Sequence, residues 1–146
     1  MQTTPALNPT SAAAALLRVS LGIALLAHGL MKVMVFTLPG TVGFFESVGF
    51  AGWTAYPVTF AEIAAGLALI AGFQTRLAAI AIQPVLIGAL SVHAGNGWSF
   101  SAPNGGWEYP AFLIVIAAAV ALLGEGAFAL DRRRTQAAPT SRLGTA

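Results

Sequence analysis

AAAALLRVSLGIALLAHGLMKVMVF, residues 12–36, is an apolar run of 25 residues with three ionisable side chains inside it: Arg18, His28 and Lys32. An α-helix rises about 1.5 Å per residue, so about 20 apolar residues cross a hydrocarbon core of about 30 Å. The run is therefore long enough for a transmembrane helix. Charged groups are costly in hydrocarbon, where they usually pair with each other or mark a functional site.

Three further apolar segments follow along the chain. Residues 53–73 and 110–130 contain 21 residues each and are long enough to span a membrane. Residues 77–92 contain only 16 and carry Gln83-Pro84 near their middle, which predicts a kinked span. We therefore predict an all-α fold, an integral membrane bundle of four antiparallel helices. Its domain covers residues 12–131, between a disordered N-terminus (1–11) and a basic, disordered cytoplasmic tail (132–146).

The composition supports a membrane domain and excludes several function classes. Of the 146 residues, 57% are hydrophobic and 8% are charged, against about 25% charged in soluble domains. The chain has no cysteine, which excludes disulfides, iron–sulfur clusters and thiol catalysis. The pI of about 9.7 comes mostly from arginines after the last apolar segment, so we expect no nucleic-acid partner. These arginines are Arg132, Arg133, Arg134 and Arg142.

The positive-inside rule orients the four predicted spans. Both termini and the turn at Arg76 would lie on one side, which also holds the C-terminal arginines. The loops on the other side, residues 37–52 and 93–109, contain no lysine or arginine. We expect a multi-pass protein of the bacterial cytoplasmic (inner) membrane with both termini in the cytoplasm.

Both outer loops have internal organisation. In the first, Thr41 can cap a short helix that Gly49 ends, with an apolar face suited to the membrane interface. The second, residues 93–109, is rich in Gly, Asn and Trp and is predicted to form an ordered cover. The two loops and the adjoining helix starts supply an outer aromatic belt. Its members are Trp53, Trp98, Trp107 and Tyr109.

Three ionisable side chains are predicted to meet below the outer face. Counted from the outer helix ends, His28 lies about 12 Å deep and Glu62 about 13 Å. Lys32 lies one turn above His28 on the same face and leans towards Glu62, because side chains tilt towards their helix N-terminus. We predict that Glu62, His28 and Lys32 form the catalytic cluster. With Trp107, Glu108 and His93 at the outer mouth, they are the candidate cofactor-binding residues.

Each of these residues also has a purely structural interpretation. The pair of Lys32 and Glu62 can equally fix the packing of the helices without any catalytic role. His28 can simply form a hydrogen bond to a neighbouring helix. His93 and Glu108 can be ordinary loop residues. Arg18 is expected to extend to the cytoplasmic interface. We expect no metal site, and haem is disfavoured because the estimated depths of the two histidines differ by about 12 Å.

Five short motifs, in this order, resemble the DoxX family of small bacterial membrane proteins. The resemblance covers residues 16–132, and Glu125 departs from it, since the family often has Gly-Pro-Gly where this chain has Gly-Glu-Gly at 124–126. No family role is therefore assigned to Glu125. The motifs are HGLMK (28–32), LPG with FFESVG (38–40 and 44–49), AEIAAG with GFQTRLA (61–66 and 72–78), GGWEY (105–109) and LDR (130–132).

The resemblance implies a redox-associated function. The family is named after a subunit of a thiosulfate:quinone oxidoreductase, and other members are linked to oxidative stress. We therefore predict a membrane subunit of a redox system in which the cluster of His28, Lys32 and Glu62 meets a quinone head group or relays its proton. A peripheral oxidoreductase or a second copy of the chain is the expected partner besides the lipid bilayer. The alternatives are a carrier or binding protein for a small polar solute and a structural anchor for a peripheral enzyme.

Overall fold

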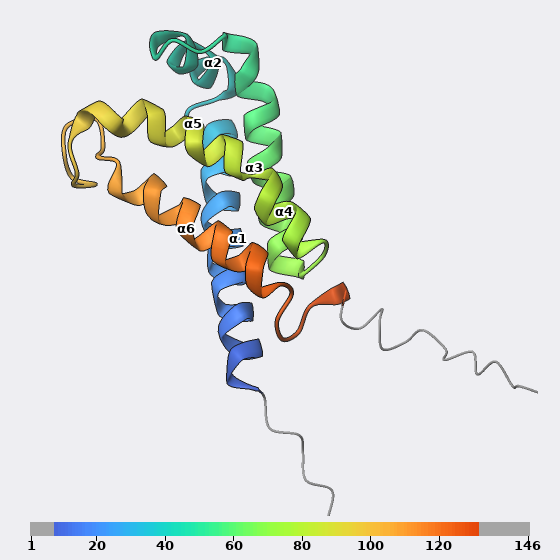
Figure 1. The fold of residues 1–146 in the computed structure, drawn as a ribbon. Coiled ribbons are helices and arrows are strands. Elements are labelled where there is room, and N and C mark those ends of the chain that lie inside the picture. The colour runs from blue at the N-terminus through green and yellow to red at the C-terminus, as the bar shows by residue number, and fades with distance from the viewer. Residues whose placement is uncertain (1–7, 132–146) are drawn as a thin grey trace, which may run out of the picture.

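The computed structural model describes residues 8–131, and this part of the chain contains helices and no strand (Figure 1). The predicted disorder of residues 1–7 and the predicted tail 132–146 lie outside the described residues. The elements are α1 (Pro9–Met34), α2 (Leu38–Ser47), η1 (Gly52–Thr54), α3 (Ala55–Ala71), α4 (Thr75–Ala81), α5 (Gln83–His93), η2 (Ala94–Asn96) and α6 (Glu108–Leu123).

Three helical stretches within the described range are long and apolar enough to cross a membrane: Pro9–Met34, Gly52–Ala71 and Thr75–Asn96. The fourth apolar helix, α6, has 16 residues and is about 24 Å long at the usual helical rise. The predicted class of an all-helical membrane protein is confirmed at this level.

Helix α1 begins earlier than predicted. The side chain of Asn8 accepts a hydrogen bond of 2.9 Å from the backbone N–H of Thr10, and Pro9 occupies the first helical position. Both features favour a helix start, because a cap satisfies a free N–H group and proline needs none there. The predicted disorder of residues 1–11 is therefore wrong for the last three of them.

The first of the two predicted outer loops contains the predicted short helix, α2, but its cap is Thr37 rather than Thr41. The Thr37 hydroxyl accepts from the N–H of Gly40 at 3.3 Å, and Pro39 is tolerated in the first turn. Thr41 lies one turn inside the helix. Gly49 follows the helix in the left-handed region, with φ 89°, as expected for a residue that ends a helix.

The third span is broken where the sequence predicts a kink. Helices α4 and α5 meet at Ile82, two residues before Pro84. Proline has no backbone N–H and its ring clashes with the preceding turn, so the helix cannot continue unchanged. The Gln83 side chain, next to the break, donates to the carbonyl oxygen of Ile114 on α6 at 3.2 Å, which ties this region to the neighbouring helix.

Helix α6 ends seven residues before its predicted end at residue 130. Gly124 and Gly126 both adopt positive φ, at 83° and 68°, and turn the chain back towards the start of α1. A side chain on Gly126 would meet the backbone of Ala15, with the Cβ 2.6 Å from its nitrogen. Glu125 therefore lies on a folded-back segment and not inside a membrane helix.

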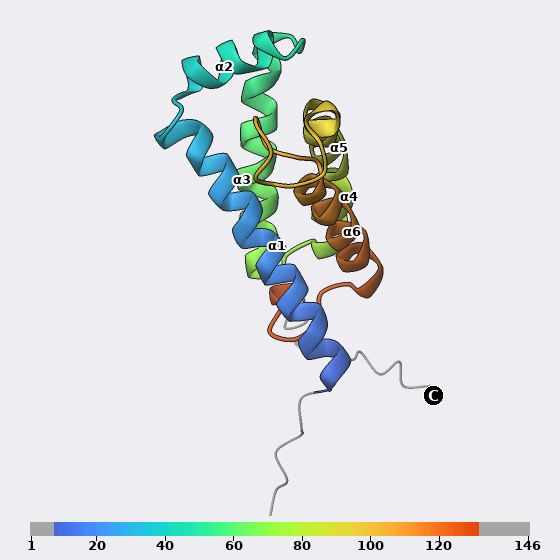
Figure 2. The same cartoon turned by 90° about the vertical axis from the view of Figure 1, so that its left-hand side faces the viewer.

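Helices α1 and α3 form an antiparallel pair whose backbones approach closely (Figure 2). Gly22 faces Gly66, where a Cβ on either residue would lie 2.9 Å from the other's carbonyl oxygen. Small residues at a helix interface allow this approach, which is typical of membrane helices. Helix α6 packs against α4, α5 and α1, and the buried core lies between these helices.

Candidate functional site

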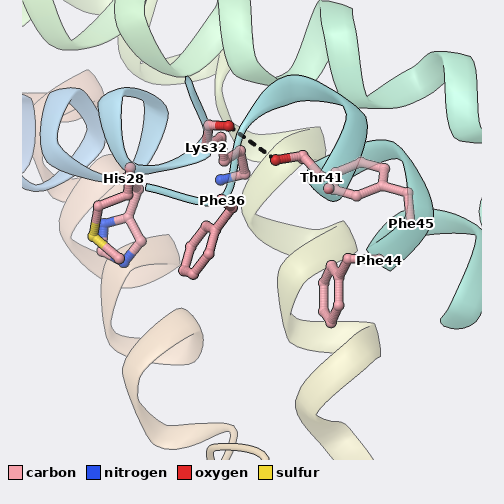
Figure 3. Close-up of a pocket in the computed structure, with 8 residues that line it drawn as sticks. His28, Lys32, Phe36, Thr41, Phe44 and Phe45 are labelled. Carbon is pink, nitrogen blue, oxygen red and sulfur yellow. Dashed lines mark hydrogen bonds between the residues drawn. The ribbon is translucent and has the colours of Figure 1, made fainter. Parts of the chain in front are cut away.

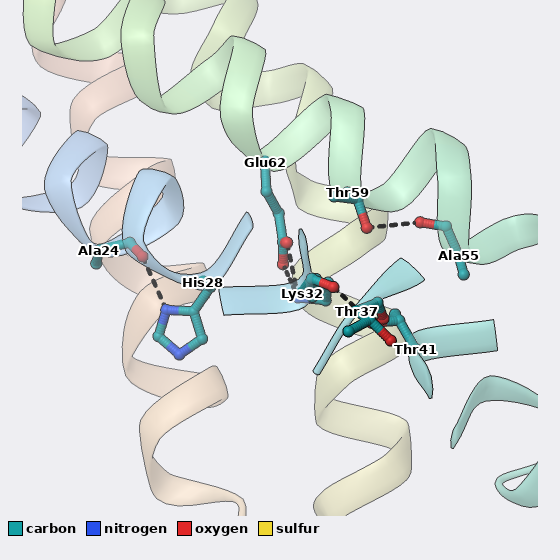
Figure 4. Close-up of polar contacts among 8 residues, drawn as sticks. All are labelled: Ala24, His28, Lys32, Thr37, Thr41, Ala55, Thr59 and Glu62. Atoms are coloured by element: carbon teal, nitrogen blue, oxygen red, sulfur yellow. Dashed lines mark hydrogen bonds and ion pairs between the residues drawn. The ribbon is translucent and has the colours of Figure 1, made fainter. Parts of the chain in front are cut away.

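An ion pair between α1 and α3 is the centre of the candidate site (Figure 4). Lys32 Nζ lies 2.8 Å from Glu62 Oε1 and 2.6 Å from Oε2, so the ammonium contacts both carboxylate oxygens. The lysine side chain is 18% exposed and that of the glutamate 9%. The predicted pairing of these residues across antiparallel helices is confirmed.

The close packing of the two helices brings the pair together. A Cβ on Gly29 would lie 2.7 Å from the Ile63 side chain and 3.2 Å from Glu62 Cβ. Any larger residue at position 29 would push α3 away from α1. Gly29 therefore sets the separation that lets Lys32 reach Glu62.

Thr41 connects α2 to the same place, a contact that sequence reasoning did not predict. Its hydroxyl lies 3.0 Å from the carbonyl oxygen of Lys32 and 3.0 Å from that of Thr37, and it can donate to either (Figure 3). The side chain is buried, with an exposed fraction of 3%. The hydroxyl satisfies a carbonyl that the end of α1 leaves without a helical partner. Helix α2 is thus held against the residue that carries the ammonium.

His28 lies one turn before Lys32 and has a defined orientation. Its Nδ1 is 2.8 Å from the carbonyl oxygen of Ala24, and its ring stacks on that of Tyr109, with centroids 5.7 Å apart and an interplanar angle of 27°. The sequence predicted Tyr109 only as an interfacial aromatic residue. The structure adds that Tyr109, at the start of α6, holds the imidazole in place.

Two cavities adjoin the ion pair. The larger, about 420 Å³, lies between α1, α2, α3 and α5, and its lining is apolar except for five residues. The smaller, about 410 Å³, lies between the end of α1 and α2 (Figure 3). His28 and Lys32 line both cavities, together with Phe44 and Phe45 of α2. The five polar residues of the larger cavity are His28, Lys32, Thr54, Glu62 and His93.

His93 lies at the end of α5, where it lines the larger cavity and holds the second outer loop. Its Nδ1 is 3.1 Å from the carbonyl oxygens of both Asn104 and Gly105. Asn96 donates to the same two oxygens. The predicted ordered cover over residues 93–109 thus has a specific anchor.

Trp107 and Glu108 do not line either of these two cavities. The Trp107 ring packs edge-on against that of Trp98, with centroids 4.6 Å apart. Glu108 Oε1 accepts a hydrogen bond of 2.6 Å from the backbone N–H of Phe100. In this structure both residues order the loop, and neither contacts His28, Lys32 or Glu62 by a described hydrogen bond or ion pair.

Arg18 corrects a prediction. It does not extend to the cytoplasmic interface but is buried, with an exposed fraction of 1%. Its guanidinium donates to the carbonyl oxygens of Leu69 and Ile70 at the end of α3, the latter at 2.9 Å, and to that of Ala127 at 3.1 Å. Glu125 also acts on it electrostatically. Arg18 therefore satisfies carbonyl groups at the end of α3 and after α6, and it takes no part in the candidate site.

The site offers donors, acceptors and an acid–base group in an apolar setting. An ammonium, a carboxylate and an imidazole meet at the wall of cavities that are otherwise lined by aromatic and aliphatic side chains. Among residues 8–131 no group of three or more His, Cys, Asp or Glu side chains has a spacing that fits a metal ion. The arrangement suits the recognition of an amphipathic organic molecule.

The fold and the site together define a class: a small all-helical membrane protein with a partly buried ion pair beside an apolar cavity. The chain belongs to the DoxX family, because the family model described as DoxX matches residues 13–94. That range includes His28, Lys32, Glu62 and His93 but not Trp107 or Glu108.

A curated relative supports the same assignment. The protein named "Putative oxidoreductase CatD" of Bacillus subtilis (strain 168) is 32% identical to this chain over 117 residues. The alignment covers 80% of this chain and 82% of the relative. No solved structure matches the chain.

Proposed function

We propose that the chain is a membrane subunit of a redox system in the bacterial cytoplasmic membrane. In this proposal α1, α3, the broken helix α4–α5 and α6 cross the bilayer as an antiparallel four-helix bundle, and α2 lies along the outer interface. The arginines at position 76 and after residue 131 face the cytoplasm. The oxidoreductase name of the relative supports the redox association.

The ligand proposed for the site is the head group of a quinone. The observation that carries this is the partly buried pair of Lys32 and Glu62 in the wall of an apolar cavity of about 420 Å³. Ligand sites of organic molecules usually have about 300–1,000 Å³ and an apolar lining with a few polar groups. The cavity therefore has a suitable size and lining for such a ring.

Each polar residue has a distinct role in this proposal. Lys32 carries three N–H groups, of which the two contacts with Glu62 use at most two, so one remains to donate to a ring oxygen. His28 and Glu62 are the groups that can accept or return a proton beside that oxygen. Phe44 and Phe45 of α2 pack around the ring and exclude bulk water. A bound quinone would supply the two-electron, two-proton chemistry.

The experiment that tests this proposal is a thermal melt of the detergent-solubilised protein with decylubiquinone or a menaquinone analogue. A ligand at a hundredfold excess over its Kd stabilises the folded state by about 2.7 kcal/mol, so the melting temperature of wild type should rise. The rise should disappear in Lys32→Met, which removes the donor to the ring oxygen, and in Glu62→Ala, which removes the carboxylate that positions this donor. It should remain in Glu46→Gln, which changes an acid on α2 that lines neither cavity.

Two outcomes would contradict the proposal. An equal rise in wild type and in the folded Lys32→Met and Glu62→Ala variants would place quinone binding elsewhere. The absence of any rise in wild type would refute the quinone as the ligand and would favour a solute carrier or a structural anchor. Solute uptake into proteoliposomes would then distinguish these two, because only a carrier transports a solute.

A further inference from the structure

The hydrogen-bonding state of His28 restricts which form of a ring ligand the site can satisfy. A backbone carbonyl oxygen only accepts hydrogen bonds, so the contact of 2.8 Å between His28 Nδ1 and the Ala24 oxygen requires a hydrogen on Nδ1. In the neutral imidazole the other nitrogen, Nε2, then carries a lone pair and acts as an acceptor. Within residues 8–131 the structure gives Nε2 no partner.

The other free group of the site is a donor. Both carboxylate oxygens of Glu62 contact Lys32 Nζ, and at least one N–H of the ammonium remains (Figure 4). Lys32 and His28 lie one turn apart on the same face of α1, and both line both cavities. A ring in either cavity can therefore contact both residues.

An oxidised quinone cannot satisfy both groups. Its two oxygens are carbonyls, which can accept from Lys32 but cannot donate to His28. A hydroquinone carries two hydroxyl groups, each of which can donate and accept. When the apolar ring excludes water from the cavity, an acceptor left without a donor loses the hydrogen bond that water gave it.

We propose that the site binds the hydroquinone form in preference to the quinone, with one ring hydroxyl donating to His28 Nε2 and the other ring oxygen accepting from Lys32. This inference rests on the proposed quinone function. The expected preference is about tenfold in Kd, as for one buried hydrogen bond made or lost. Tyr109 and Ala24 are positioning residues, because they hold the imidazole with Nε2 available.

Glu46 offers a control. It lies on α2, which contributes Phe44 and Phe45 to both cavities, but Glu46 itself is exposed and lines neither cavity. Glu46→Gln should therefore leave the preference intact, whereas His28→Phe should abolish it. Phenylalanine at position 28 keeps an aromatic ring for stacking on Tyr109.

The test is an anaerobic titration of the solubilised protein with decylubiquinol and decylubiquinone at about pH 8, where imidazole in water is neutral. Wild type and Glu46→Gln should bind the quinol about tenfold more tightly, and His28→Phe should bind both forms equally. A tenfold ratio also raises the two-electron midpoint potential of the bound couple by about 30 mV, which a redox titration measures independently.

The outcomes separate this inference from the proposed function. Equal binding of the two forms by wild type refutes the hydroquinone preference and leaves the quinone site standing, whereas no binding of either form refutes both. A preference that survives in His28→Phe, or that disappears in Glu46→Gln, refutes the role of His28.

A second measurement covers the case in which His28→Phe does not fold. Thymol, an apolar phenol, should displace decylubiquinone from wild type more effectively than thymol methyl ether, which lacks the hydroxyl donor. Equal displacement by the two compounds would overturn the inference without any variant.

Discussion

The ion pair of Lys32 and Glu62 allows a quantitative test of how the bundle is held together. Replacing Glu62 by alanine leaves the Lys32 ammonium without its two carboxylate contacts at 2.6 and 2.8 Å. Breaking a buried pair in this way typically costs about 3–5 kcal/mol. The lysine side chain is 18% exposed and borders cavities that water can enter, so we expect the lower end, about 3 kcal/mol.

Removing both charges should restore much of this loss. In the double variant Glu62→Ala with Lys32→Met no charge is left in the low-dielectric region, and methionine fills part of the lysine volume. We expect a coupling free energy of about 2–3 kcal/mol between the two substitutions. Glu62→Gln should cost less than Glu62→Ala, because its amide oxygen still accepts a hydrogen bond from the ammonium.

The assay is equilibrium unfolding in mixed micelles with a rising fraction of sodium dodecyl sulfate, followed by tryptophan fluorescence. A control cycle combines Lys32→Met with Glu46→Ala, which removes an exposed acid on α2, and should be additive within about 0.5 kcal/mol. A coupling free energy between Lys32 and Glu62 that is no larger than in the control cycle would refute the pairing as a stabilising interaction.

Three further substitutions have defined expected results. Gly66→Ala should destabilise the α1–α3 pair by about 2 kcal/mol in the same unfolding assay, because its Cβ would lie 2.7 Å from a backbone nitrogen of α1; an unchanged midpoint would show that the helices can separate freely. Arg18→Lys should lower the free energy of unfolding by about 3 kcal/mol, because one ammonium cannot replace the planar guanidinium that bridges two chain segments. A loss as small as that of an exposed substitution would contradict the buried geometry. A cysteine at Ser101 should react with a membrane-impermeant maleimide in intact cells and one at Thr140 should not; the opposite pattern would reverse the proposed orientation.

The central ion pair could be predicted because it depends mainly on helix geometry. Counting residues from the span ends places His28 and Glu62 at similar depths with Lys32 one turn above His28, and the tilt of side chains towards the helix N-terminus brings Lys32 and Glu62 together. The break near Pro84 was predictable for a similar reason, since proline acts on its own helix. Periodicity and local chemistry are sufficient where an interaction follows from one helix or from two antiparallel neighbours.

The errors have a different physical origin. Arg18 was expected at the interface because the carbonyl groups that bind it come from the end of α3 and from a segment after α6, which no local pattern reveals. The early end of α6 depends on Gly124 and Gly126 turning back against α1, although both glycines lie in an apolar run. The stacking of Tyr109 on His28 likewise requires the position of α6 relative to α1, which residue counting does not provide.

The contacts of Arg18 impose an order on biosynthesis. The guanidinium joins α1 to the end of α3, about 50 residues later, and to Ala127, which is 109 residues later in the chain. During insertion from the ribosome, the hairpin of α1 and α3 can therefore form early, with Leu69 and Ile70 already bound to Arg18. The hydrogen bond from Arg18 to the carbonyl oxygen of Ala127 can form only after α6 has been synthesised. Formation of this last hydrogen bond therefore requires that α6 is complete and that the segment after it has folded back onto α1.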